Sequence, residues 1–300
     1  MSAATPAQAV LLDGAWRSPP RLIRLLRWLL RNKVAAAAIL WLVVICALAA
    51  AASVIGLHDP NEQDLNNILV GPGGAGHLFG TDDLGRDILA RIIFGGRVSL
   101  FIGLAVASVG GVLGSIFGLL TGYFQGRVDS AVMLFMDALQ SLPNIILALG
   151  LLAALGTGTS SVIIALSVSA IPAFARVVRA EVLQSVTRDY VMAARSLGAS
   201  DIHIILRHTL RDATPTILVQ GSIICGLAIV AEAALGFLGV GVKLPTPTWG
   251  NMLSEAYIYT RQEPLFAIFP GAAITITVLA LNMLGDSLRD VLDPKARGRG

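Results

Sequence analysis

Two acidic residues stand inside long apolar stretches of this chain, and they are the side chains best placed for chemistry at membrane depth. A carboxylate there costs roughly 2.5 to 3.5 kcal/mol on insertion scales, so it normally faces a protein interior or a water-filled cavity. Glu232 is expected either to line a solute path or to hold its helix through an interhelical hydrogen bond, and both interpretations stay open. For Asp137, which is followed by Pro143, the pattern favours a hinge or packing role.

Other kinds of chemistry lack the residues that they need. The sequence contains no G-x-x-x-x-G-K-[ST] motif to bind nucleotide phosphates and no H-E-x-x-H zinc motif. Gly221-Ser222 has no histidine partner at membrane depth, which argues against an intramembrane protease. Cys46 and Cys225 both lie in apolar runs and are expected to be packing residues. All four histidines lie outside those runs, so we expect no catalytic residue, cofactor or metal site: His58, His77, His203 and His208.

The elements that must position these carboxylates are transmembrane helices. Of the 300 residues, 55% are hydrophobic and only 14% are charged, whereas ordinary soluble domains carry about 25% charged residues. A bilayer core of about 30 Å needs about 20 helical residues. Pro172 shortens the fourth candidate, which we expect to begin near Thr159. The sequence thus predicts an all-α polytopic membrane protein with about six spans: Val34–Leu57, Val98–Tyr123, Ala131–Leu155, Val162–Phe174, Ile217–Val242 and Phe266–Leu288.

The distribution of Lys and Arg predicts the orientation of these spans. With a cytoplasmic N-terminus, the inner segments are those before 34, 124–130, 175–213 and after 288. They hold 17 of the 22 basic residues, and the outer segments hold the other five: Arg86, Arg91, Arg97, Lys243 and Arg261. The positive-inside rule therefore favours cytoplasmic termini in a multi-pass membrane protein. The net charge of +3 reflects this asymmetry and does not require a nucleic-acid partner.

The segments outside the spans divide the chain further. Residues 1–33 are expected to be cytoplasmic, with an amphipathic basic helix over 21–33 on the inner leaflet. The first span, 34–57, resembles a signal peptide, but its long preceding region argues against cleavage. In the external segment 58–97, Asp83 is expected to cap a helix with Leu84, Ile88 and Ile92 on one face, and packing on the spans is preferred over contact with solute. Residues 289–300 form a cytoplasmic tail.

The core 98–288 is predicted to be one tightly packed helix bundle. Its second span carries glycines at four-residue spacing, namely Gly110, Gly114, Gly118 and Gly122, which permits close helix crossing. Thr214 is expected to cap the fifth span, with Pro215 at its first helical position.

A basic, helix-patterned segment interrupts this core on the cytoplasmic side, within 175–213. Thr187 or Asp189 can start a short helix that Gly198 stops, and Ser200 can cap a second helix that runs to about His208. Small residues at Ala193, Ala194 and Ala199 would allow a partner surface to approach, and Arg195 and Arg207 could pair with acidic groups on it. The alternative is a solvated amphipathic loop on the inner leaflet.

This segment resembles the EAA loop of ABC importer permeases, whose pattern is Glu-Ala-Ala, three residues and then Gly. The matching positions are Met192, Ala193, Ala194 and Gly198, with methionine in place of glutamate, and Leu210 is followed by Arg211 where proline is usual. Longer motifs resemble the C-type permeases of dipeptide, oligopeptide and nickel importers. These motifs are His77-Leu-Phe-Gly-Thr-Asp-Asp-Leu-Gly-Arg-Asp87, Glu232-Ala-Ala-Leu-Gly-Phe-Leu-Gly-Val-Gly241, and the C-terminal Phe269-Pro-Gly271, Asn282 and Gly285-Asp-Ser-Leu-Arg-Asp290.

The resemblance implies a function and a set of partners. The chain would form half of a solute pathway in the bacterial inner membrane, beside a homologous permease, with two cytoplasmic ATPase subunits and an external solute-binding protein. It would hold no cofactor, whereas ATP and Mg²⁺ would bind the ATPases. The segment with Asp189, Met192 and Arg195 would contact them, and Asn282 joins Glu232 and Asp137 as a possible pathway or structural group. Among dipeptides, oligopeptides, glutathione-like peptides, opines and nickel, peptides are the first expectation. The alternative is a self-sufficient ion-coupled secondary transporter or channel that uses Glu232 and Asp137.

Overall fold

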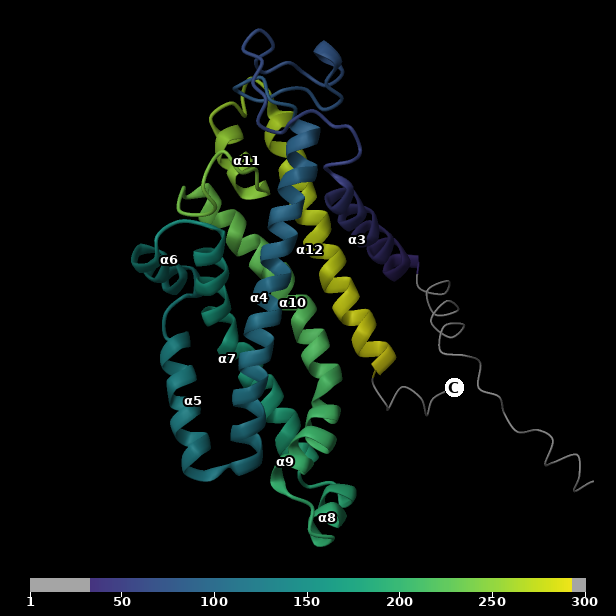
Figure 1. The fold of residues 1–300 in the computed structure, drawn as a ribbon, viewed down its shortest axis with the longest axis vertical. Helices are drawn as coiled ribbons and strands as arrows, with labels where there is room; N and C mark the ends of the chain where they lie inside the picture. The colour runs from purple at the N-terminus through teal and green to yellow at the C-terminus, as the bar shows by residue number, and fades with distance from the viewer. Residues whose placement is uncertain (1–32, 293–300) are drawn as a thin grey trace, which may run out of the picture.

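A computed structural model describes residues 33–292, which form helices joined by turns, with no β-strand among them (Figure 1). The predicted basic helix over 21–33 falls almost wholly outside these residues, as does most of the tail 289–300. The helices are α3 (Lys33–Ala51), α4 (Ile88–Phe124), α5 (Gly126–Gln140), α6 (Asn144–Leu155), α7 (Thr159–Ser185), α8 (Asp189–Ser196), α9 (Asp201–Ile204), α10 (Leu210–Phe237), α11 (Trp249–Tyr257) and α12 (Pro264–Leu292), with a 3₁₀ turn at Gly74–Gly76 and a π-helical turn at Ile205–Thr209.

The spans agree with the predicted number. Five helices of the described part are long and apolar enough to cross a membrane, and the bent pair α5 and α6 can count as a sixth. That pair turns by 87° between Gln140 and Asn144. Pro143 stands immediately before α6 with extended backbone (ψ 135°), and proline disfavours helical backbone in the residue before it. The expected bend at Pro143 is therefore confirmed.

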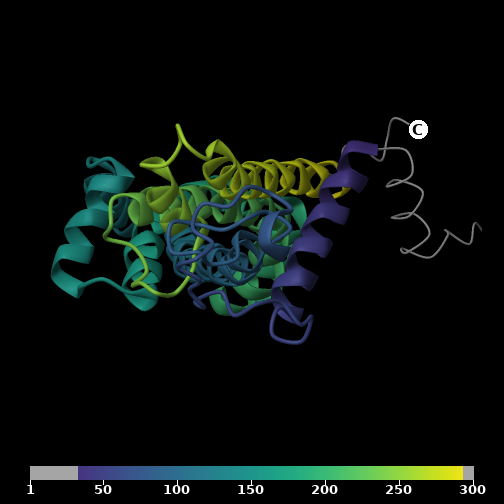
Figure 2. The same cartoon turned by 90° about the horizontal axis from the view of Figure 1, so that it is seen from above.

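The molecule has two distinct ends (Figure 1). Residues 52–87 and α11 gather at one, which we call the loop end, and α8 and α9 lie at the other, the α8–α9 end. Helix α4 runs through the centre and packs on α7 and α10, while α12 packs on α10 and α3. The view from the loop end places α3 and the α5–α6 pair on opposite sides of the bundle (Figure 2).

The contact between α4 and α7 depends on the glycine stripe of α4. A Cβ added at Gly114 would lie 2.5 Å from Cβ of Phe174 and 2.6 Å from the Ile171 carbonyl oxygen. Gly118 and Gly122 meet α7 in the same way, with Val178 and Val182 as neighbours. The predicted close helix crossing is confirmed, because no side chain fits between the two backbones.

Several predicted boundaries are wrong. The second span and the external helix before it form one helix, α4, whose N-cap is Asp87 and not Asp83. Asp87 Oδ1 accepts a hydrogen bond from the Ala90 backbone N–H at 2.7 Å. Asp82 and Asp83 instead pair with Arg86. The first span ends at Ala51 rather than Leu57.

The fourth and fifth spans are also longer than predicted. Helix α7 begins at Thr159, as expected, but continues through Pro172 to Ser185, so the segment 175–213 is largely helical. The fifth span does not begin at Thr214. One helix runs from Asp201 through the π-helical turn to Phe237, and Pro215 lies in its interior. The hydroxyl of Thr214 donates to the Leu210 carbonyl (2.7 Å) rather than capping a helix.

Candidate functional site

The segment between α7 and α10 forms a short helix pair, as predicted. Helix α8 begins at Asp189, and Gly198 after it has φ +84°, a left-handed conformation that glycine adopts without strain. Backbone bonds from Gly198 N–H to Arg195 O (3.0 Å) and from Ala199 N–H to Ala194 O (3.1 Å) close the turn. Ser200 Oγ then accepts from the His203 N–H at 3.4 Å and caps α9. Only the expected end near His208 is wrong, because α9 continues into α10. We call residues 186–209 the helix-pair segment.

Tyr123, at the end of α4, ties both short helices to the bundle. Its hydroxyl donates to Asp201 Oδ1 at 2.6 Å, and Arg195 Nη2 donates to the same hydroxyl at 3.3 Å. The Arg195 guanidinium also lies 5.5 Å from the centroid of the Tyr123 ring, within the range of a cation–π contact. Within the chain Arg195 therefore holds α8 against α4, and its expected pairing with a partner's acidic group stays a prediction.

Asp212 makes a second connection, near the start of α10. One oxygen of its carboxylate accepts from Ser185 Oγ (2.5 Å), from Arg188 Nη1 (3.1 Å) and from the hydroxyl of Tyr190. Arg188 also lies 3.6 Å from Glu181 of α7. The ends of α7, α8 and α10 are thereby joined at a single carboxylate.

The helix-pair segment has one apolar side toward the bundle and another toward the outside. Val191, Ile204 and Ile205 are buried against Val178 and Val182 of α7. Elsewhere on the segment Leu197 is 89% exposed, and further large apolar side chains are exposed at Met192, Ile202 and Leu206, while Tyr190 is exposed although its hydroxyl bonds to Asp212. The remaining predicted contact residues are exposed or partly so: Asp189, Ala193, Ala194, Ala199, Ser200 and Arg207.

The predicted polar residues of the spans do not converge. Asp137 accepts a hydrogen bond from Arg176 Nη2 (2.6 Å), which links α5 to α7 with both side chains exposed. Glu232 is fully buried and accepts from Ser99 Oγ of α4 at 3.0 Å. Asn282 lies exposed on α12.

Ser99 connects Glu232 to a third helix. Its oxygen also accepts from the backbone N–H of Trp249 at 3.3 Å, and the Trp249 indole donates to the Ile92 carbonyl at 2.9 Å. Glu232 thus takes part in a junction of α4, α10 and α11 near the loop end.

A buried charge cluster at the loop end was missed by sequence reasoning. Arg91 is fully buried and donates to Glu255 of α11 (2.7 Å), while Arg86 donates to the same carboxylate (3.0 Å) and to Asp82 (2.5 Å). Burial raises the pKa of the Glu255 carboxyl, and the two guanidinium groups oppose that shift. The run of Asp and Arg from 82 to 91 was a signal for ion pairs, but nothing local indicated Glu255 as the partner.

Comparisons with known proteins agree with this architecture. Residues 114–298 match the family described as binding-protein-dependent transport system inner membrane component. The chain is 42% identical over 289 residues to the glutathione transport system permease protein GsiD of Pectobacterium atrosepticum, covering 96% of this chain and 95% of that protein. It is 40% identical over 245 residues to the probable D,D-dipeptide transport system permease protein DdpC of Escherichia coli, covering 82% of each.

A solved structure shows the same fold. In the inward-facing MetNI methionine ABC transporter, one chain matches this one with a TM-score of 0.56 and 19% identity, over 69% of this chain and 98% of that one. These matches support the importer interpretation over a self-sufficient secondary transporter or channel. The chain belongs to the binding-protein-dependent transport system inner membrane components, and it is a permease subunit of an ABC importer.

Proposed function

We propose that this chain forms half of the translocation pathway of a peptide importer, and that the helix-pair segment receives the movement of cytoplasmic ATPase subunits. The observation that carries the proposal is the exposed apolar side of that segment, centred on Leu197, on a helix pair whose other side is fixed to the bundle. Clusters of exposed apolar residues often mark protein contact sites, and four such residues fall within 186–209: Met192, Leu197, Ile202 and Leu206.

The way in which the segment is anchored supports a mechanical role. Tyr123 and Asp212 join α8 and α9 to the ends of α4, α7 and α10 through short polar contacts. A force on α8 therefore reaches three spans together, as a rigid-body change between two states of the bundle requires. ATP would drive the change because the ATPases bind it with different affinity in the two states. ATP and Mg²⁺ would bind those subunits.

The orientation of the chain in the membrane is proposed from the charge distribution. The α8–α9 end carries the basic residues of the helix-pair segment, and the positive-inside rule places such a segment in the cytoplasm. The loop end, with α11 and residues 52–87, would then face the outside and receive solute from a binding protein. A homologous permease would complete the pathway along the exposed apolar helix faces.

The solute class is proposed from the relatives. One is named for glutathione, a tripeptide, and another for D,D-dipeptides. We propose that di- and oligopeptides are the transported class.

The test is reconstitution of the complex. The tagged chain would be extracted in mild detergent, and the attached proteins would be identified by mass spectrometry. Proteoliposomes with the whole assembly should take up labelled dipeptide only with ATP and the binding protein. Gradient-driven uptake by liposomes that contain this chain alone would contradict the proposal.

A further inference from the structure

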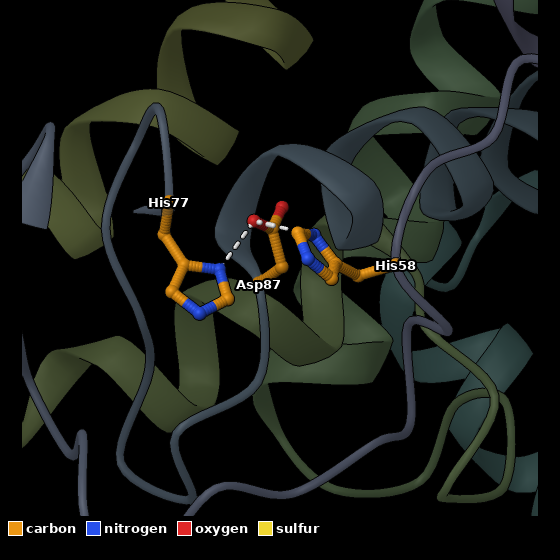
Figure 3. A group of neighbouring side chains, drawn as sticks. All are labelled: His58, His77 and Asp87. Atoms are coloured by element: carbon orange, nitrogen blue, oxygen red, sulfur yellow. Dashed lines mark hydrogen bonds and ion pairs between the residues drawn. The ribbon is translucent and has the colours of Figure 1, made fainter. Parts of the chain in front are cut away.

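The loop end contains a group of side chains to which the proposed function assigns no role. His58 follows α3, His77 lies in the turn before α4, and Asp87 is the N-cap of α4. The two imidazoles lie on either side of the Asp87 carboxylate and point toward it (Figure 3). Nδ1 of His77 lies 2.7 Å from Asp87 Oδ2, and Nδ1 of His58 lies 3.5 Å from the same oxygen.

From this geometry we propose that His58, His77 and Asp87 bind a divalent transition-metal ion, for which Zn²⁺ is the natural probe. Two imidazole nitrogens and one carboxylate oxygen are a recurrent Zn²⁺ ligand set with an open fourth position. Each residue offers one ligand atom, and the three atoms lie within 4.8 Å of one another. Zn²⁺ bonds of about 2.0 Å in tetrahedral geometry place ligand atoms about 3.3 Å apart, so only small side-chain shifts are needed.

The ligands are held in place by contacts other than those with one another. Asp87 Oδ1 is occupied by the Ala90 N–H (2.7 Å), which leaves Oδ2 facing the histidines. The backbone of His77 bonds to Gly73 N–H (2.9 Å) and to Gly74 O (3.0 Å). Arg91 Nη1 donates to the Pro60 carbonyl at 3.3 Å and so holds the turn after His58 near α4. Such supporting contacts orient metal ligands and raise affinity.

The local charges also favour a cation at this position. Among residues 33–292, the two histidines are the only ion-pair partners of Asp87. The neighbouring acidic group of Asp82, Asp83 and Glu255 differs, because Arg86 and Arg91 already neutralise it. We therefore propose no metal at that second group.

An ion can reach the proposed site from solvent. His58 is 58% exposed, whereas His77 is 13% and Asp87 6% exposed. His58 also lines a cavity of about 570 Å³ together with Asp59 and Arg97. A bound ion would link three segments: the one after α3 that holds His58, the turn that holds His77, and the start of α4 at Asp87. The proposal departs from the expectation that the chain has no metal site, which had considered only the membrane spans.

The test measures Zn²⁺ bound by the purified full complex, using competition with a chromophoric chelator. His58→Ala removes an exposed ligand, so it leaves the folded core intact, and His203→Ala removes another exposed histidine, in α9 at the opposite end of the molecule. His77→Asn puts an amide nitrogen near the place of Nδ1, which can keep the hydrogen bond to Asp87 but not the metal bond. His58→Ala and His77→Asn lie at the loop end, away from the proposed ATPase contact, whereas His203→Ala lies in the helix-pair segment; because the readout is bound Zn²⁺, the outcome does not depend on uptake.

We expect the His58 and His77 variants to bind Zn²⁺ at this site at least about 10 to 100 times more weakly, because even outer-shell substitutions have effects of that size. At Zn²⁺ concentrations that just fill the site of the unchanged protein, each variant should therefore bind one ion fewer per chain. His203→Ala should bind as the unchanged protein does, and Ca²⁺ should not compete, since it prefers oxygen ligands. No specific Zn²⁺ binding by the unchanged complex, equal binding in His58→Ala, or an equal loss in His203→Ala would overturn the proposal.

Discussion

Substituting alanine for Gly114 tests the packing of α4 on α7, the contact on which the bundle depends. The new Cβ would lie 2.5 Å from Cβ of Phe174, whereas carbon atoms normally approach to about 3.5–4.0 Å. The two helices must therefore separate by about 1 Å, and overpacking of this kind costs roughly 1–3 kcal/mol. Alanine also raises intrinsic helix propensity by about 1 kcal/mol relative to glycine, which masks part of the loss.

The matched control is Gly150→Ala in α6, because nothing lies within 4 Å of an added Cβ there. The propensity gain is common to both variants, so the difference between them isolates the steric effect. With about 2–4 °C of Tm per kcal/mol, Gly114→Ala should melt roughly 2 to 12 °C below Gly150→Ala in thermal unfolding of the purified complex. Equal melting temperatures would refute the reasoning that α4 and α7 meet without room for a methyl group.

Three further predictions concern polar contacts. Tyr123→Phe should assemble normally but transport fewer peptides per ATP, because Asp201 and α8 lose their shared contact; equal uptake-to-ATPase ratios would contradict this. Arg179→Ala should lower the free energy of unfolding by about 1–3 kcal/mol, because the Arg179 guanidinium donates to both carboxylate oxygens of Asp129. Arg176→Ala should lower it by at most about 1 kcal/mol, because the pair of Arg176 with Asp137 is exposed; chemical denaturation of both variants tests the order. Glu232→Gln should keep uptake while Glu232→Ala lowers Tm, because its buried oxygen accepts a hydrogen bond that links two helices; loss of uptake in the glutamine variant alone would favour a pathway role instead.

The sequence predicted the structure correctly where a residue or a short segment permits only one local conformation. Apolar length predicted the number of spans. The bend before α6 followed from Pro143, and the turn between α8 and α9 followed from Gly198 and Ser200. In each of these cases the residue itself restricts the backbone or supplies the cap.

Local rules failed where several residues satisfy them equally. Asp83 and Asp87 are both good N-caps, and the choice depended on Arg86, which pairs with the acidic residues before it. Pro215 can begin a helix or lie within one, and packing of Ile204 and Ile205 against α7 extended the helix upstream of it. Glu255, 164 residues from Arg91, had no local signal.

The same limit applies to the candidate site. The sequence located the helix-pair segment and its exposed residues, because capping and small residues are local features. It gave no signal of the contact between Arg195 and Tyr123, which lies 72 residues away. Which face of a short helix is anchored and which is free depends on tertiary contacts.

The central claim is that the exposed apolar side of the helix-pair segment contacts the ATPase subunits. Leu197→Asp places a charge on its most exposed residue, and Ile258→Asp is the control, because Ile258 directly follows α11 and is 76% exposed. Burying a leucine contributes about 1.5–3 kcal/mol, so losing that contact should weaken ATPase binding by at least about tenfold.

The decisive measurement is the amount of ATPase that stays attached to each purified variant, together with ATP-driven uptake. The account predicts that Leu197→Asp loses both while remaining inserted in the membrane, and that Ile258→Asp keeps its ATPases. ATPase retention and uptake by Leu197→Asp at the level of the unchanged protein would contradict it.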